Sequence, residues 1–165
     1  MRNERRNSGF TLIEVLVSLV VLATAAAGTG AMISMAVAST RAARVQTWTT
    51  LLAVGKLEEL RALSATATGL ALPPQGSLTR DAAGYVDYVD RTGRAIDVDG
   101  PSPQSVYIRR WSIHALPADP AETALVQVLV SPVAAARAGD PDREPARVPG
   151  DALMVSVIAR RRSAE

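Results

Sequence analysis

The longest uncharged stretch of this chain, from Val15 to Thr40, constrains its fold more than any other feature. A membrane helix needs about 20 apolar residues to cross the hydrocarbon core, so this stretch is long enough to span a bilayer. One carboxylate, Glu14, stands inside the apolar segment 10–22. A charge within a membrane helix costs roughly 2.5–3.5 kcal/mol on insertion scales. A sequence that only had to cross a bilayer would avoid that cost, so we expect Glu14 to have a partner.

Residues 1–9 form a short, polar and basic leader that contains Arg2, Arg5 and Arg6. Arginines next to an apolar span tend to remain on the cytoplasmic side of the membrane. The sequence therefore predicts a single-pass protein with a cytoplasmic N-terminus. We divide the chain into this leader, a membrane and assembly helix at 10–40, and an extracytoplasmic domain at 41–165.

The second half of the membrane segment is rich in small residues, which let helices approach closely in lipid. They are Ala23, Ala25, Ala26, Ala27, Gly28, Gly30 and Ala31. We expect the segment to pack against other helices as well as to anchor the chain. Gly28 and Gly30 are the points of expected flexibility, because glycine weakens the interior of a helix.

The charged and reactive residues exclude several classes of function. The net charge is +2, and nearly all positive charge is arginine, with Lys56 as the single lysine. The chain has no cysteine and one histidine, His114. Thiol catalysis and thiolate metal sites are therefore excluded, and there is little material for a zinc site or a Ser-His-Asp triad. We predict no catalytic residue, no metal site and no cofactor.

Helical periodicity continues beyond the membrane segment, over residues 41–64. Apolar residues recur there at three- and four-residue spacings, as in an amphipathic helix. One stripe consists of Val45, Trp48 and Leu52, and a neighbouring one of Ala53, Leu57, Leu60 and Ser64. Lys56 with Glu59, and Glu58 with Arg61, have the spacing of ion pairs across one helical turn. This half of the helix must pack on the chain that follows it.

The rest of the chain predicts a loop over 65–84, marked by glycine and proline, and a sheet over 85–160. The strand candidates lie between turn signals, at 85–90, 96–101, 105–116, 124–130 and 153–159. A second long loop is expected over 132–151. Short connections favour antiparallel pairing, so we predict an α+β fold with one long helix on a sheet of three or four strands. Trp48 and Trp111 are expected in the core between helix and sheet.

The segment Gly9-Phe10-Thr11-Leu12-Ile13-Glu14-Val15 resembles the prepilin processing motif of type IV pilins and of the pseudopilins of type II secretion. The resemblance covers about residues 1–40. It implies a pilin-like fold and cleavage between Gly9 and Phe10 by prepilin peptidase, a membrane aspartic peptidase. Phe10 then becomes the N-methylated first residue, and Glu14 occupies the position at which the family has its glutamate.

The resemblance also implies a partner for Glu14. Cleavage creates an ammonium group on Phe10, and in a stack of subunits Glu14 of one subunit can pair with the Phe10 amine of a neighbour. Two charges that are each costly in lipid are tolerated as a pair, whereas removal of either leaves the other uncompensated. We therefore expect an assembly salt bridge that sets the register of the subunits.

Beyond residue 40 the chain is similar to minor pilins and minor pseudopilins over 51–61 and in the tryptophan-bearing strand 107–113. It lacks the mid-helix proline of the major pilins and the C-terminal cysteine pair of many adhesive pilins. The resemblance thus implies a minor subunit, held in the inner membrane and then assembled into a filament, that is an enzyme's substrate and not an enzyme. The implied partners are prepilin peptidase, other pilin or pseudopilin subunits, membrane lipid and, indirectly, an assembly ATPase with its platform complex.

Three other interpretations remain open on these residues. A secretory signal peptide cut near Ala25, or a plain membrane anchor, accounts for the apolar run but leaves Glu14 unexplained. A competence or adhesion pilin would use the loops 65–84 and 132–151 to bind DNA or a surface. An unrelated exported protein would carry the motif by chance.

Several further residues have a functional and an ordinary interpretation. Asp97-Val98-Asp99-Gly100 has the composition of a calcium loop, but the EF-hand register places Ala95 and Val106 at ligand positions, so a solvated turn is expected. The arginine groups at 109–110 and 160–162 are expected to be solvated, and DNA is not an expected partner. His114 is expected to be a partly exposed strand residue.

Overall fold

The computed structural model describes residues 10–65, 75–96, 100–118, 123–138 and 149–159. The leader with Gly9, most of the loop after the helix, Asp97 and Asp99, and Arg160–Arg162 lie outside the described residues. The chain divides into two compact units, Met1–Arg41 and Ala42–Glu165. Each unit is described by itself.

A single helix, α1 (Leu12–Ala65), continues from the first unit into the second. In the first unit its side chains are exposed, including Leu12, Leu19 and Met35. In the described part of the chain, one helix is long and apolar enough to cross a membrane, judged by length and composition. An apolar surface of this extent requires lipid or other protein around it.

The part of α1 in the second unit, residues 42–65, is amphipathic, as predicted. Ala53, Leu57 and Leu60 of the predicted stripe are buried, and the expected ion pairs Lys56–Glu59 and Glu58–Arg61 both form. The prediction for Trp48 was wrong, because this side chain is 37% exposed. Thr49, one position and about 100° further round the helix, is the residue that faces inward.

The second unit contains one antiparallel sheet with the strand order β2-β1-β3-β4-β5. The strands are β1 (Val86–Val89), β2 (Ala95–Ile96), β3 (Tyr107–Ala115), β4 (Thr123–Pro132) and β5 (Ala152–Ala159). The α+β prediction is confirmed, with five strands instead of three or four. The additional strand is the two-residue β2, which pairs with β1 across the turn at Asp90–Gly93.

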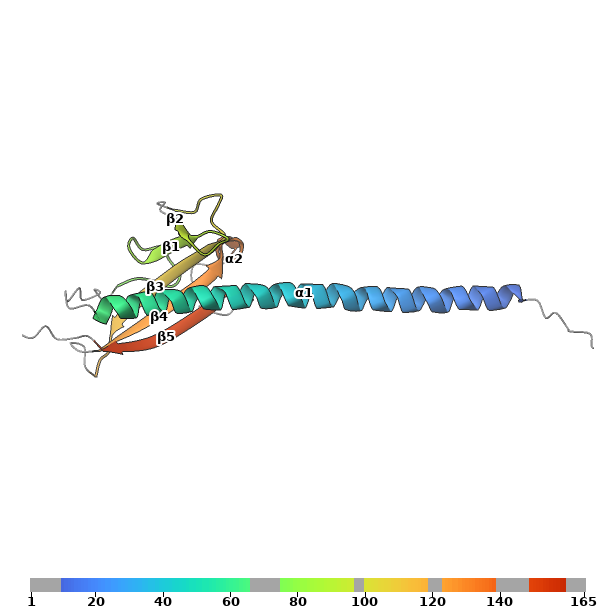
Figure 1. Cartoon of the computed structure of the whole chain (residues 1–165), viewed down its shortest axis with the longest axis horizontal. Coiled ribbons are helices and arrows are strands. Elements are labelled where there is room, and N and C mark those ends of the chain that lie inside the picture. Colours follow the sequence, from blue (N-terminus) through green and yellow to red (C-terminus); the bar gives the residue numbers. More distant parts are fainter. Residues whose placement is uncertain (1–9, 66–74, 97–99, 119–122, 139–148, 160–165) are drawn as a thin grey trace, which may run out of the picture. The chain divides into compact units, whose positions relative to one another are not determined.

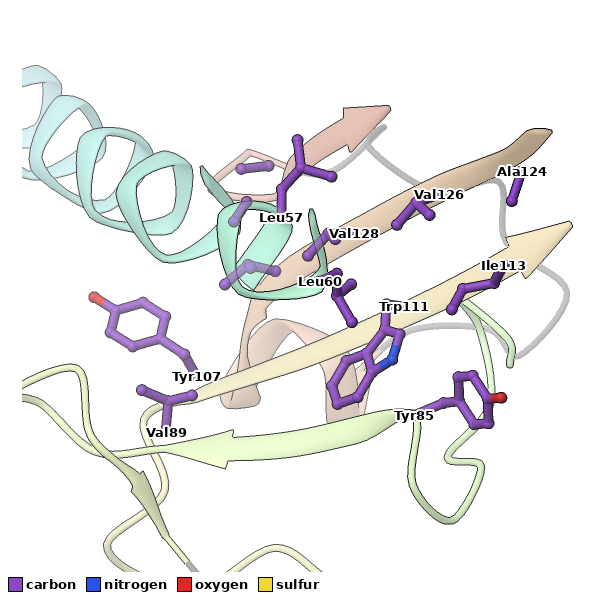
Figure 2. Packing of buried hydrophobic residues seen from close by; sticks show 13 residues of the cluster. Leu57, Leu60, Tyr85, Val89, Tyr107, Trp111, Ile113, Ala124, Val126 and Val128 are labelled. Atoms are coloured by element: carbon purple, nitrogen blue, oxygen red, sulfur yellow. The ribbon is translucent and has the colours of Figure 1, made fainter. Parts of the chain in front are cut away.

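The core lies between residues 42–65 of α1 and one face of this sheet (Figures 1 and 2). Leu57 and Leu60 of the helix meet Trp111 and Ile113 of β3 and alternate residues of β4. Tyr107, Trp111 and Ile113 share this face, as their period-two spacing predicted. The alternation is clearest in the first half of β4, whereas β3 is buried on both faces over most of its length.

The opposite face of the sheet carries a smaller cluster of Tyr88, Ile108 and Val133. Val133 begins a short helix, α2 (Val133–Ala138), in a segment for which the sequence predicted a loop. The prediction was wrong at this point because Val-Ala-Ala-Ala-Arg-Ala is locally a good helix sequence. The short helix also covers apolar side chains that would otherwise face solvent.

Candidate functional site

The start of α1 contains the residues that the sequence singled out for processing and assembly. Phe10 and Thr11 precede the first helical residue, Leu12. The Phe10 side chain is 80% exposed. Gly9 lies outside the described residues, so the predicted cleavage point, between Gly9 and Phe10, falls at the boundary of the described part of the chain, two residues before α1.

Thr11 is the N-cap of α1. The backbone N–H of Glu14 donates to Thr11 Oγ1 at 3.4 Å and to the Thr11 carbonyl at 3.1 Å, and the Val15 N–H donates to the same carbonyl at 3.2 Å. A threonine followed three residues later by glutamate is the sequence pattern of a capping box. This role of Thr11 was missed from the sequence, although the Thr-x-x-Glu spacing was there to indicate it.

The Glu14 carboxylate lies in the first turn of α1 and is exposed. A negative charge is favourable there, because the N-terminus of a helix carries a partial positive charge. Within the described residues, this carboxylate makes no ion pair and accepts no hydrogen bond. The geometry therefore leaves it available to a donor from another molecule.

Five hydroxyl groups along the first unit are bonded to their own helix. Ser18 donates to the Glu14 carbonyl at 2.7 Å, and Ser34 donates to the Ala31 carbonyl at 2.8 Å. The hydroxyls of Thr24, Thr29 and Thr40 likewise donate to a backbone carbonyl one turn earlier in the helix. Such bonds satisfy polar groups that would be costly in lipid. The Glu14 carboxylate, by contrast, carries a full charge and has no such bond within the described residues.

The helix continues without interruption through Gly28 and Gly30. A Cβ added at either glycine would meet nothing within 4 Å. Both positions are therefore open on the isolated chain, as a surface for close helix packing must be. Flexibility at these glycines stays a prediction.

Residues 5–30 match the family described as the prokaryotic N-terminal methylation motif. The chain carries the N-terminal motif of type IV pilins and pseudopilins. No curated protein and no solved structure matches it. The pilin motif implies processing by prepilin peptidase and assembly with other pilin subunits. It covers the leader and the first part of α1, where Phe10 and Glu14 lie.

Two of the arginines considered for DNA contact, Arg109 and Arg110, make ion pairs within the domain. The prediction that they are solvated was wrong for Arg109, which is buried. Arg109 pairs with Asp87 of β1, and Arg110 Nε donates to Asp81 Oδ1 at 2.7 Å. His114 is exposed, as expected. Across the described ranges, no group of three or more His, Asp or Glu side chains is placed to hold a metal ion.

Asp81 connects the segment before β1 to β1 and β3 of the sheet. Its carboxylate accepts hydrogen bonds from Tyr88 Oη and from Arg110 Nε, each at 2.7 Å. Partial burial acts to raise the pKa of Asp81, but the two hydrogen bonds and the guanidinium charge outweigh burial and lower that pKa. The lowered pKa marks a structural contact, because these three side chains already satisfy one another.

Proposed function

We propose that this chain is a minor pilin or minor pseudopilin: a precursor that prepilin peptidase cleaves between Gly9 and Phe10, and a structural subunit of a type IV pilus or a type II secretion pseudopilus. It is the substrate of an enzyme and not itself an enzyme. Before assembly it is held in the inner membrane by residues 10–40, with a cytoplasmic N-terminus and an extracytoplasmic domain.

The observation that supports this proposal best is the Glu14 carboxylate. It lies exposed in the first turn of an apolar helix, inside the matched motif, and makes no ion pair and no side-chain hydrogen bond within the described residues. In lipid a lone carboxylate is costly. The Phe10 amine of a neighbouring subunit supplies the opposite charge at the same level of the helix bundle, so the pair forms only on assembly.

The minor role is supported by the composition of the helix and of the domain. The helix has Gly28 and Gly30 where major pilins have a proline, and the chain has no cysteine for a C-terminal disulfide. In this proposal the helices pack laterally into a filament under the action of an assembly ATPase and its platform proteins. The globular domain then determines which subunits are accepted as neighbours.

Mass spectrometry of the mature N-terminus tests the proposal. The expected product begins at methylated Phe10. An uncut leader, or a product that begins near Ala26 or Gly28, contradicts it, since the latter indicates a signal peptide. Co-purification with secretion-system or pilus subunits then identifies the machine, whereas salt-sensitive retention on DNA would indicate an uptake pilus.

A further inference from the structure

Lys56, the single lysine of the chain, is buried between α1 and the sheet. The residue is 6% exposed and lies in sequence between the core residues Ala53 and Leu57. Lysine is almost never fully buried unless its charge is paired. The groups that contact this ammonium therefore indicate its role in the fold.

Lys56 makes one contact within its own helix and two contacts with the sheet. Its Nζ lies 2.9 Å from Glu59 Oε1, one turn along α1. It also lies 3.2 Å from Asp87 Oδ2 of β1 and 4.1 Å from the centroid of the Trp111 ring of β3. The aspartate and the indole face are both favourable partners for a cation at this range, and they connect the helix to two strands.

The sheet holds Asp87 in place independently of the helix. Asp87 and Arg109 are direct partners in the β1–β3 ladder, and Asp87 Oδ2 accepts from Arg109 Nε at 3.1 Å and from Nη2 at 2.5 Å. The carboxylate is therefore paired whether or not Lys56 is present. Lys56 is the part of this charge cluster that α1 supplies.

Apart from Lys56, the inward face of α1 is small or apolar at successive turns, a pattern that by itself is compatible with more than one position along the sheet. The inward face presents Thr49, Ala53, Leu57 and Leu60, so a shift of one turn exchanges one small or apolar side chain for another at several positions. The charge cluster is less tolerant, since the same shift places Leu52 or Leu60 against Asp87. It also moves the Lys56 ammonium onto apolar surface, where burial of a charge is costly.

We propose that Lys56 fixes the register of α1 on the sheet through its ion pair with Asp87. Arg109 holds the Asp87 carboxylate in place. We call the Lys56–Asp87 contact the polar latch. Buried ion pairs contribute little net stability relative to apolar side chains of similar size, and selection of one register is their best-attested use. The latch is a property of the folded domain and does not depend on the proposed function.

Amine acylation of the full-length protein in detergent micelles tests the contact with Asp87. Since the chain has one lysine, all side-chain acylation located by peptide mass spectrometry belongs to Lys56. We expect Lys56 to react at least about tenfold more slowly in the folded than in the denatured protein, and Asp87→Asn to remove most of that protection while helix content is retained. The matched control is Glu59→Gln, which removes the partner within the helix and should change the rate by less than about twofold.

Equal protection in the wild type and Asp87→Asn overturns the proposal, and so does equal loss in Glu59→Gln and Asp87→Asn. In the second case the local helix pair would be what shields the amine. Both outcomes are readable without knowledge of any partner protein.

Cross-linking of introduced cysteines tests the register itself, and it decides the question if Asp87→Asn does not fold. Arg61 Nη2 donates to Ser156 Oγ of β5 at 2.8 Å, so a short bifunctional thiol reagent should join Arg61→Cys to Ser156→Cys. Ser64 lies about one turn after Arg61 in α1. A cross-link between Ser64→Cys and Ser156→Cys therefore reports a helix that has shifted by one turn along the sheet. The chain contains no other cysteine.

In the wild-type background we expect the 61–156 product to dominate. With Lys56→Met added, the proposal expects the domain to stay folded and the share of the 64–156 product to rise several-fold, because the apolar contacts no longer exclude the shifted register. An unchanged product ratio in Lys56→Met shows that packing alone sets the register and overturns the latch. The Glu59→Gln background should match the wild type.

Discussion

Glu14 and Lys56 are both charged residues in apolar stretches of the same helix. Lys56 is buried and has Asp87, Glu59 and the Trp111 ring as partners, whereas the Glu14 carboxylate is exposed and has no ion pair or side-chain hydrogen bond among the described residues. The half of α1 that belongs to the folded domain satisfies its charge within the chain. The membrane half leaves its charge for another molecule. In the proposed function, the Glu14 charge finds its partner only on assembly, in another subunit.

The largest effect is expected from removal of the Glu14 charge. Glu14→Leu should reduce incorporation into filaments by at least about tenfold, because the Phe10 amine of the neighbour then stays uncompensated in lipid. Incorporation is measured by the amount of the chain in sheared or purified filaments. Membrane insertion and the unfolding midpoint of the domain should be unchanged, as in the matched control Glu58→Leu. Normal incorporation of Glu14→Leu would show that assembly does not need the Glu14 charge.

The next largest effect is expected on the free energy of unfolding when an apolar side chain of α1 is shortened, and it should differ between the two units. Leu60, 2% exposed, is part of the core, and Leu60→Ala should lower the free energy of unfolding by about 3 kcal/mol. Leu19→Ala, at a position 60% exposed in the membrane half, should leave that free energy within about 0.5 kcal/mol of the wild type. Chemical denaturation in micelles, followed by tryptophan fluorescence from Trp48 and Trp111, measures both. Similar losses for the two variants would mean that the membrane half is part of the cooperative fold.

Glycine substitutions should act with opposite signs in the two regions. Gly76 has φ +96°, and an added Cβ would contact the Trp111 carbonyl oxygen and lie 2.8 Å from Tyr85 Cδ1, so Gly76→Ala should destabilise the domain by about 1–3 kcal/mol. Gly30→Ala has open space and should favour the helix by up to about 1 kcal/mol. Denaturation and helix content measure the two effects. If Gly30→Ala also lowers filament yield, the predicted flexibility at this glycine is needed for assembly.

The smallest effect concerns pH and is confined to the domain. The pKa of Asp81 is lowered by its bonds to Tyr88 and Arg110, although partial burial opposes this. A carboxyl with a lowered folded pKa stabilises above its unfolded value of 3.8, and that contribution is lost as the pH falls through the folded pKa. The side chain is 45% exposed, so we expect only a few tenths of a kcal/mol. Denaturation between pH 5 and about pH 2.5 should show a shallower acid loss for Asp81→Asn than for the wild type.

Features that depend on local pattern could be predicted from the amino-acid sequence alone. The uncharged run, the motif around Gly9 and Phe10, the period-two strands and the spacing of Leu57 and Leu60 each follow from one stretch of chain, because helix and strand periodicities are local. The exposure of Trp48 was not predicted, since it depends on what packs beside it. The strand β2 overlaps the predicted strand 96–101 only at Ile96, and α2 was missed although its sequence favours a helix locally.

The partners of the charged side chains depend on the tertiary fold. Lys56 was predicted to pair with Glu59, which is a neighbour along the helix. Its second carboxylate, Asp87, lies on a strand far along the chain, and no spacing rule relates the two positions. The burial of Lys56 depends on the sheet that packs on residues 42–65 of α1, which no helical spacing specifies. The physical reason is that the cost of a charge depends on its surroundings in space, which a local sequence pattern does not specify.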